Sequence, residues 1–202
     1  MMKIASIGSG NIGGTLGKKW AACGHQVMFG SIDPQGEPMR SLIETAGPNA
    51  MAGSVREAIA FGEVILLAIP GTEVDNVLEL AGDLHHKILI NCTNRYDGKS
   101  ADSEVLRLAQ NARVVRAFHT LPFEVLANPY YGALTPTLFM SGADSDAKEV
   151  VAQLARDIGL DPVDAGDSAN MEKIEAMNVT LWGILSPQFG RDYSLRVLRR
   201  EP

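Results

Sequence analysis

The sequence has few cysteines, no long apolar run and no excess of positive charge. Its two cysteines, Cys23 and Cys92, are far apart and lack the spacing of metal ligands, so we interpret both as buried thiols of a cytoplasmic protein. No apolar run reaches the ~18 residues that a membrane span requires. The formal net charge of −6 argues against a nucleic-acid partner. The short N-terminal apolar run ends in a glycine turn, so we expect no signal peptide.

The remaining composition is that of an ordinary globular protein. With 202 residues, of which 46% are hydrophobic and 21% charged, the chain can bury a sizeable core. We expect a single domain over residues 1–202, with a core over about 1–120 and an extension over about 121–202. We interpret the basic residues near the C-terminus as a solvated tail. They are Arg191, Arg196, Arg199 and Arg200.

The most specific pattern lies near the start of the chain. A strand is expected over residues 3–7, a helix over 11–22 and a second strand over 26–29, and the first turn reads Gly8-Ser9-Gly10-Asn11-Ile12-Gly13. This is the strand–turn–helix context that the dinucleotide fingerprint requires.

Each glycine of that turn has a physical role. Gly8 allows the tight turn, Gly10 lets the backbone approach a pyrophosphate, and Gly13 lets the helix pack closely on the strand. The pyrophosphate then lies on the free N–H groups of the helix N-terminus, where the helix dipole favours an anion. The motif therefore predicts a dinucleotide site.

Strands and helices alternate along the rest of the chain. Residues 64–69 form an uninterrupted apolar run, which is typical of a strand covered on both faces. The pattern predicts an α/β fold, a Rossmann-type doubly wound and mostly parallel sheet, with a short C-terminal α/β extension ending in a long helix. Ser54 and Thr72 are expected N-caps. Further strands are expected near 49–52, 87–91, 113–118, 137–141 and 161–165, and helices near 39–46, 55–61, 73–84, 103–110, 147–158 and 168–185.

The residues after the second strand give conflicting signals about the cofactor. An acid at the strand end would bind a free ribose 2′-hydroxyl, and an arginine would bind a 2′-phosphate. Gly30 stands where the acid is usual and Ser31 offers a hydroxyl, which favours NADP. Ile32 is not an arginine and Asp33 is a nearby acid, which favours NAD.

Ligands of such sheets bind beyond the carboxyl ends of the strands. Three ends supply candidates: Ile69-Pro70, residues 91–94 and His119-Thr120. Ile69 and Pro70 suit a nicotinamide ring. Asn91 either holds the edge of a ring or simply ends its strand. His119 serves either as a proton relay and acceptor-binding group or as a structural hydrogen-bonding residue. We interpret the other histidines, His25, His85 and His86, as surface or loop-packing residues.

Two absences bear on the reaction. The chain has no well-placed Ser-x-x-x-Lys pair for alcohol oxidation, and no helical substrate domain of ~100 residues follows the core. A flavin or deazaflavin acceptor fits, because it takes a hydride mainly through positioning.

These residues resemble the F-420-dependent NADP oxidoreductase family over nearly the whole chain. The same module resembles the cytosolic domain of the six-transmembrane metalloreductases. The segments that carry the resemblance are 3–17, Gly24-His25, Phe29-Gly30-Ser31, Ala117-Phe118-His119-Thr120-Leu121-Pro122, Ala127-Asn128 and Asp164-Ala165-Gly166.

The resemblance implies roles for particular residues. Ser9, Gly10, Asn11 and Ile12 should contact the pyrophosphate, and Ser31 the 2′-phosphate. The His119-Thr120 loop should lie near the nicotinamide and its acceptor. The C-terminal helices of the family complete the acceptor pocket and make dimer contacts, which implies a homodimer.

One position departs from the family. Ile32 replaces the usual arginine and loses its bidentate grip on a phosphate, unless Arg40 or Lys18 substitutes for it.

The first hypothesis is an NAD(P)-dependent oxidoreductase that passes a hydride between the nicotinamide, expected to be NADP with NAD as the alternative, and a flavin- or F-420-like acceptor. The second is a dinucleotide-sensing module without turnover. The third is a small-substrate dehydrogenase or imine reductase completed by a dimer partner. The sequence leaves all three open.

Overall fold

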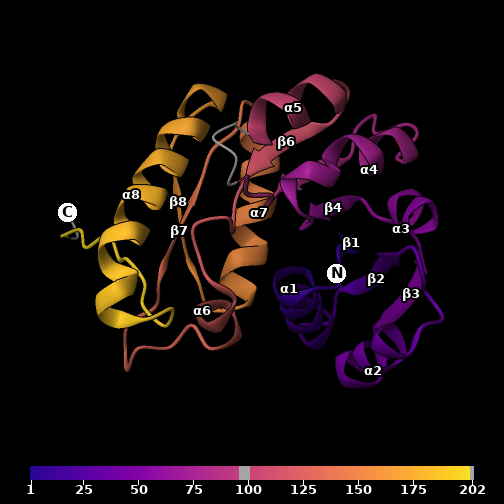
Figure 1. Ribbon diagram of the computed structural model, residues 1–202, viewed down its shortest axis with the longest axis horizontal. Coiled ribbons are helices and arrows are strands. Elements are labelled where there is room, and N and C mark those ends of the chain that lie inside the picture. Colours follow the sequence, from indigo (N-terminus) through magenta and orange to yellow (C-terminus); the bar gives the residue numbers. More distant parts are fainter. Residues whose placement is uncertain (96–100, 201–202) are drawn as a thin grey trace.

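The structure is a computed structural model that describes residues 1–95 and 101–200. Six parallel strands form one sheet in the order β3-β2-β1-β4-β5-β6 (Figure 1). Strands β2 and β3 follow β1 on one side, and β4, β5 and β6 follow on its other side. The order of strands therefore reverses between β1 and β4, as in a doubly wound Rossmann fold. The predicted fold class is confirmed. The strands are β1 Lys3–Ile7, β2 Gln26–Ser31, β3 Ala50–Ser54, β4 Val64–Leu67, β5 Ile88–Asn91 and β6 Arg113–Arg116.

Helices cover both faces of this sheet, and each face has its own apolar core. Trp20 of α1 and Val151 of α7 are buried on one face, and Ile59 of α3 and Val105 of α5 on the other. The two layers follow from right-handed crossovers between parallel strands. The helices are α1 Asn11–Ala22, α2 Glu37–Ala46, α3 Val55–Phe61, α4 Val74–Leu80, α5 Ala101–Leu108, α6 Phe123–Ala127, α7 Ser145–Asp157 and α8 Met171–Phe189.

The C-terminal extension builds a second, smaller layer. β7 (Thr137–Met140) and β8 (Asp161–Asp164) pair in parallel as a separate sheet with α7 between them in sequence. One antiparallel bridge, from Arg116 to Ser141, joins this unit to the end of β6. Figure 1 shows α8 on the far side of the extension, across the molecule from α2 and α3.

Several predicted boundaries were right and others need correction. Ser54 caps α3 with a reciprocal bond to Glu57, as predicted. Thr72 is no cap, because it lies inside the short 3₁₀ turn Gly71–Glu73 before α4. β6 ends two residues early because Phe118 has a φ of +64°, which no strand accommodates. α6 was not predicted, and α8 continues past Pro187 to Phe189.

One expectation about burial was wrong. Cys23 is exposed, because it lies in the turn after α1. The C-terminal arginines are exposed, as expected, and two of them also make polar contacts: Arg191 donates to Glu124 Oε1 at 2.8 Å and Arg196 donates to the Thr135 carbonyl.

The other histidines lie as expected. His25 packs under the turn before β2, 3.0 Å from Asp157, and His85 and His86 are exposed. Among the helices that the structure describes, none has the length and apolarity needed to cross a membrane. Within residues 1–95 and 101–200, no group of three or more His, Cys, Asp or Glu side chains is arranged to hold a metal ion.

Candidate cofactor and acceptor cleft

The glycines of the first turn have the separate roles that the fingerprint predicts. Gly8 has a φ of +99°, and a Cβ there would lie 2.2 Å from the Ala68 carbonyl oxygen. A Cβ on Gly13 would lie 1.8 Å from the Gly8 carbonyl oxygen. A Cβ on Gly10 would meet nothing within 4 Å. Gly8 and Gly13 are therefore required for packing, whereas Gly10 faces open space where a ligand can approach the backbone.

The N-terminus of α1 is suited to an anion. Gly10 is its N-cap, no side chain caps it, and the first turn contains no acid. The N–H groups of the first turn and the positive end of the helix dipole can then both act on a pyrophosphate. Ser9 and Asn11 are exposed beside this end, and half-buried Ile12 faces the cleft described below. These residues fit the cofactor that the motif implies.

At the adenosine end of the site, no arginine directly follows Ser31. Ser31 ends β2, and its hydroxyl accepts a hydrogen bond from the Asp33 backbone at 3.1 Å. Ile32 is 97% exposed. Arg40, one of the two suggested substitutes for the missing arginine, is held by Glu37 at 2.9 Å. Ile32 thus faces solvent at this end, Ser31 is half-buried, and the ion pair of Arg40 with Glu37 is itself exposed.

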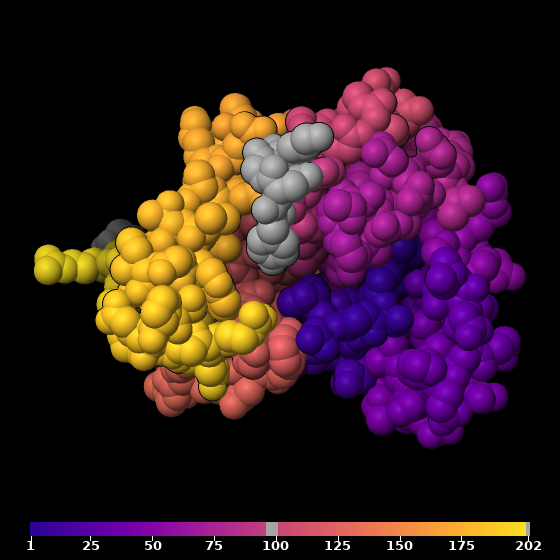
Figure 2. Space-filling model, in the orientation of Figure 1, coloured from indigo at the N-terminus to yellow at the C-terminus, as the bar shows by residue number. Residues whose placement is uncertain are grey.

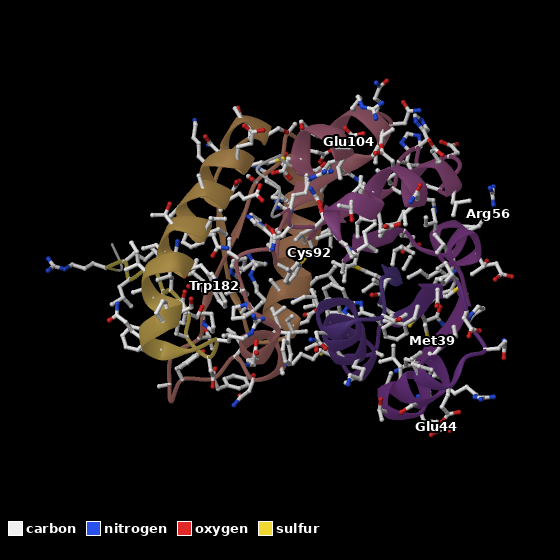
Figure 3. The ribbon with its side chains drawn as sticks, in the orientation of Figure 1. Met39, Glu44, Arg56, Cys92, Glu104 and Trp182 are labelled. Carbon is white, nitrogen blue, oxygen red and sulfur yellow. The ribbon has the colours of Figure 1, made fainter. Side chains whose placement is uncertain are left out.

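Two adjoining pockets extend from the glycine turn along the carboxyl edge of the sheet. The first holds about 480 Å³ and the second about 490 Å³, and they share Ile12, Asn94 and Arg95. Figure 2 shows the hollow between the C-terminal helix and the N-terminal segment, and Figure 3 marks Trp182 on α8 and Cys92 near the centre. The other lining residues of the first pocket are Ala68, Ile69, Pro70, Gly71, Thr72 and Cys92; those of the second are His119, Thr120, Leu121, Pro122, Glu175, Asn178, Val179, Trp182 and Arg191.

The structure places Ile69, Pro70 and Thr120 on the pocket walls but Asn91 beneath them. The Asn91 side chain is fully buried, and its amide nitrogen donates to Asp102 Oδ1 at 2.7 Å. Its oxygen accepts from the backbone and hydroxyl of Thr93, at 3.1 and 2.6 Å. Asn91 therefore cannot hold a ring, because both ends of its amide are engaged. We correct its role to support of the strand end.

Cys92 behaves as the sequence suggested. It is 7% exposed, and burial raises the pKa of its thiol to about 12. A thiol with so high a pKa is no nucleophile at neutral pH.

His119 follows a strained turn at the end of β6. Phe118 takes a left-handed φ of +64°, which costs a bulky residue roughly 1–2 kcal/mol, and its buried ring packs edge-on against Trp20. This turn directs His119 to the wall of the second pocket. The imidazole is 4% exposed, and among the described residues neither ring nitrogen has a hydrogen-bond partner. The hydroxyl of Thr120 is unpartnered in the same way.

Burial keeps the imidazole of His119 neutral. Desolvation lowers its pKa well below 6.5, the charge of Arg116 lowers it further, and the nearby Ala117 backbone opposes the shift. A neutral ring offers one donor and one acceptor nitrogen to a ligand. Both interpretations of His119, as a structural hydrogen-bonding residue and as a ligand-binding group, stay predictions.

The buried imidazole should make stability depend on pH. Unfolded His119 regains its ordinary pKa and binds a proton more readily than the folded form. The free energy of unfolding should thus fall as the pH drops below about 6.5, by up to about 1.4 kcal/mol per pH unit. His119→Phe should remove this dependence. Urea unfolding of both proteins at pH 7 and pH 5 measures it, and equal losses in the two proteins would contradict the prediction.

Sequence reasoning missed the residue that organises the cleft floor, Arg116. Its side chain is fully buried at the end of β6. The guanidinium donates to the carbonyl of Thr93 and to Asn94 Oδ1, the latter at 3.1 Å. Its Nε lies 3.1 Å from Asp102 Oδ1, and its Nη2 lies 3.5 Å from Glu175 Oε1.

Arg116 thus ties three separate parts of the chain together: the loop after β5, helix α5 and helix α8. A buried guanidinium needs such partners, because an uncompensated charge in the interior is strongly unfavourable. The available signal was a second arginine in the strand, after Arg113 and two valines, but the partners of Arg116 are too distant in sequence to be named from it.

Comparison with known proteins identifies a family for part of the chain. Residues 3–95 match the model of the family described as NADP oxidoreductase, coenzyme F420-dependent. The resemblance to this family that the sequence motifs indicate is confirmed. The expected class, an NAD(P)-dependent oxidoreductase, is confirmed at the level of the family. The metalloreductase STEAP3 of Rattus norvegicus is 28% identical over 189 residues, 89% of this chain. The chain spans 37% of the length of that protein.

Solved structures agree with the fold. A protein from Arthrobacter sp. FB24, provisionally assigned as an F420-dependent NADP-reductase, shares 25% identity with a TM-score of 0.87, over 98% of this chain and all of the other. The hypothetical protein SMa0349 from Sinorhizobium meliloti shares 28% identity with a TM-score of 0.75, over 99% of this chain and 97% of the other. A reductive aminase from Aspergillus terreus, in complex with NADPH4, shares the fold at 17% identity, with a TM-score of 0.71, 93% coverage of this chain and 63% of its own.

Proposed function

We propose that this chain, whose residues 3–95 belong to the F420-dependent NADP oxidoreductase family, transfers a hydride between NADPH and a flavin- or deazaflavin-like acceptor. The observation that carries the proposal is the pair of adjoining pockets. One begins at the glycine turn and the other lies under α8, and they share Ile12, Asn94 and Arg95. Two flat rings in adjoining pockets can approach each other closely, which is the main requirement of hydride transfer.

Different residues bind the pyrophosphate and the nicotinamide of the dinucleotide. The backbone of Ser9, Gly10 and Asn11 binds the pyrophosphate at the N-terminus of α1. Ile69 and Pro70 give the nicotinamide an apolar wall. The bound dinucleotide supplies the hydride.

The second pocket receives the acceptor. His119 and Thr120 offer unpartnered polar atoms to its edge, and Trp182 offers an aromatic face for stacking. The two pockets, of about 480 and 490 Å³, are within the usual size range of small-molecule sites.

Anaerobic oxidation of NADPH, with NADH in parallel, tests the proposal against coenzyme F-420 and FMN. Turnover with either acceptor is expected. Tight binding of NADPH without oxidation by any acceptor would contradict the proposal and favour a dinucleotide sensor. Turnover of an imine or a keto acid in their place would favour the small-substrate dehydrogenase.

Ile32 should limit the preference for NADPH. Ile32→Arg places a guanidinium beside Ser31, where it can bind a 2′-phosphate through two hydrogen bonds. The variant should bind NADPH about 10-fold more tightly, roughly 1.4 kcal/mol, and leave NADH affinity unchanged. Fluorescence titration with both nucleotides measures this. Ile32→Gln, which is uncharged, is the control. Equal gains for NADPH and NADH would show that the 2′-phosphate does not lie at this loop.

A further inference from the structure

Arg191 lines the second pocket just beyond the end of α8. The helix ends at Phe189, and Gly190 takes a left-handed φ of +71° that does not continue it. The guanidinium carbon of Arg191 then lies 5.3 Å from the ring centre of Trp182, and both side chains line the pocket. Because the Arg191 side chain is also 56% exposed, it stands where the pocket opens to solvent.

Contacts from two helices hold the guanidinium of Arg191 in place. Its Nε donates to Glu124 Oε1 at 2.8 Å, and its carbon lies 5.9 Å from the ring centre of Phe123. Glu124 and Phe123 belong to α6, whereas Trp182 belongs to α8. A guanidinium that is hydrogen-bonded on one side and lies over aromatic rings loses less conformational freedom when it binds a ligand. Arg191 is therefore held ready for a ligand at the pocket mouth.

The outer end of this guanidinium is open. Within residues 1–95 and 101–200, Nε is the only nitrogen of Arg191 that makes a hydrogen bond, and Nη1 and Nη2 have no partner. The two Nη groups form a planar fork whose spacing matches two oxygens of a carboxylate or a phosphate. Glu124 binds on the Nε side of the guanidinium, so it leaves this fork available.

Two other charged side chains on the wall of this pocket already have partners. Glu175 lies 3.5 Å from the guanidinium of buried Arg116. Arg95 donates to the Gly71 carbonyl at 3.2 Å and has other contacts as well. Arg191 is therefore the cation best placed to meet an anionic group that extends from the pocket toward solvent.

We propose that Arg191 binds an anionic group, a phosphate or a carboxylate, on the side chain of the acceptor. The inference rests on the proposed function, because it states which acceptors the second pocket selects. The acceptor ring lies inside the pocket, and its charged side chain leaves through the mouth, where Nη1 and Nη2 each donate to one oxygen of the anion. Acceptors with such a group are therefore preferred over neutral molecules with the same ring.

FMN and riboflavin test this selection, because they share one ring system and differ by a single phosphate. Titration of the protein alone, followed by flavin fluorescence, measures its affinity for each. The wild type should bind FMN about 10-fold more tightly than riboflavin, and Arg191→Gln should remove the difference by weakening the binding of FMN alone. Added salt should weaken FMN binding to the wild type more than to Arg191→Gln, because salt screens a contact between exposed charges. Equal affinity of the wild type for the two flavins, or binding of neither, would overturn the inference.

Two further variants separate anion binding from a purely structural role of Arg191. Arg156, on α7, has an ion pair of the same length, 2.8 Å, with Glu149 and lines neither pocket. Arg156→Gln should therefore leave both affinities within about twofold of the wild type. Glu124→Gln keeps an oxygen that accepts from Nε and removes a competing negative charge, so FMN should bind about threefold more tightly. Equal losses for FMN and riboflavin in Arg191→Gln, or weaker binding of FMN by Glu124→Gln, would overturn the inference.

NADPH also carries phosphates, so it is titrated in parallel. Its affinity should not change in Arg191→Gln, and a loss for NADPH in place of FMN would assign Arg191 to the dinucleotide and overturn the inference. The outcome for the proposed function is separate. Arg191-dependent binding of FMN without oxidation of NADPH by any acceptor would contradict the proposed function and support the inference. Reduction of FMN and riboflavin with equal KM would support the proposed function and overturn the inference.

Discussion

Replacing Gly10 by alanine is expected to weaken NADPH binding strongly without unfolding the protein. A Cβ at this position meets no atom within 4 Å, and the backbone has an ordinary extended conformation, so the fold accommodates alanine. The added methyl group would project into the space that the pyrophosphate needs. We expect affinity for NADPH to fall at least about 100-fold, or about 2.7 kcal/mol. Fluorescence titration with NADPH measures the loss, and thermal unfolding checks the fold.

The matched variant Gly13→Ala should instead destabilise the fold. Its Cβ would lie 1.8 Å from the Gly8 carbonyl oxygen, which is rigid backbone and cannot move aside without distorting the turn. We expect destabilisation of about 3 kcal/mol or more. Gly183→Ala, in open space on α8, is the control and should change neither stability nor binding adversely. Equal binding losses in Gly10→Ala and Gly183→Ala would place the pyrophosphate elsewhere.

Loss of Arg116 should be the most destabilising single change at the cleft floor. Arg116→Met removes the cation from buried Asp102 and the donor from the Thr93 carbonyl. Breaking a buried ion pair on one side costs about 3–5 kcal/mol, because the remaining charge is uncompensated. Urea unfolding at pH 7 measures the change. A loss below about 1 kcal/mol would contradict the account of Arg116 as the organiser of the floor.

A double variant identifies the cause of that loss. If the isolated carboxylate of Asp102 is responsible, Arg116→Met combined with Asp102→Asn should be more stable than Arg116→Met alone. Strictly additive losses would assign the effect to packing and hydrogen bonds instead of charge. Arg116→Lys keeps the charge but not the planar fork, and should fall between the wild type and Arg116→Met.

Local patterns predicted the part of the fold that holds the dinucleotide. The bounds of α1 and α3 and the capping by Ser54 follow from spacing and side-chain chemistry within a few residues. The glycine turn was equally local, because a tight turn and a close approach leave a direct signature in residue type. The parallel, doubly wound sheet followed from the alternation of strands and helices.

The rest of the cleft depends on contacts between distant parts of the chain. Asn91 was a candidate for holding the edge of a ring because it ends a strand, but its amide donates to Asp102, eleven residues away, and is buried beneath the pocket. The contact between Glu175 and Arg116, 3.5 Å apart, joins α8 to the end of β6, and no local pattern indicates it. The pairing of β7 with β8 apart from the main sheet is likewise set by tertiary packing, which no strand pattern encodes.

The most direct test of the central claim is a single turnover with NADPH carrying two deuterium atoms at C4 of the nicotinamide. Protein loaded with this nucleotide is mixed anaerobically with coenzyme F-420, and mass spectrometry measures the deuterium in the reduced product. Two rings held in adjoining pockets predict one deuterium transferred directly to the acceptor, without exchange into water. Reduced acceptor without deuterium would contradict the account, because the electrons would then have travelled by a route other than hydride transfer within the cleft.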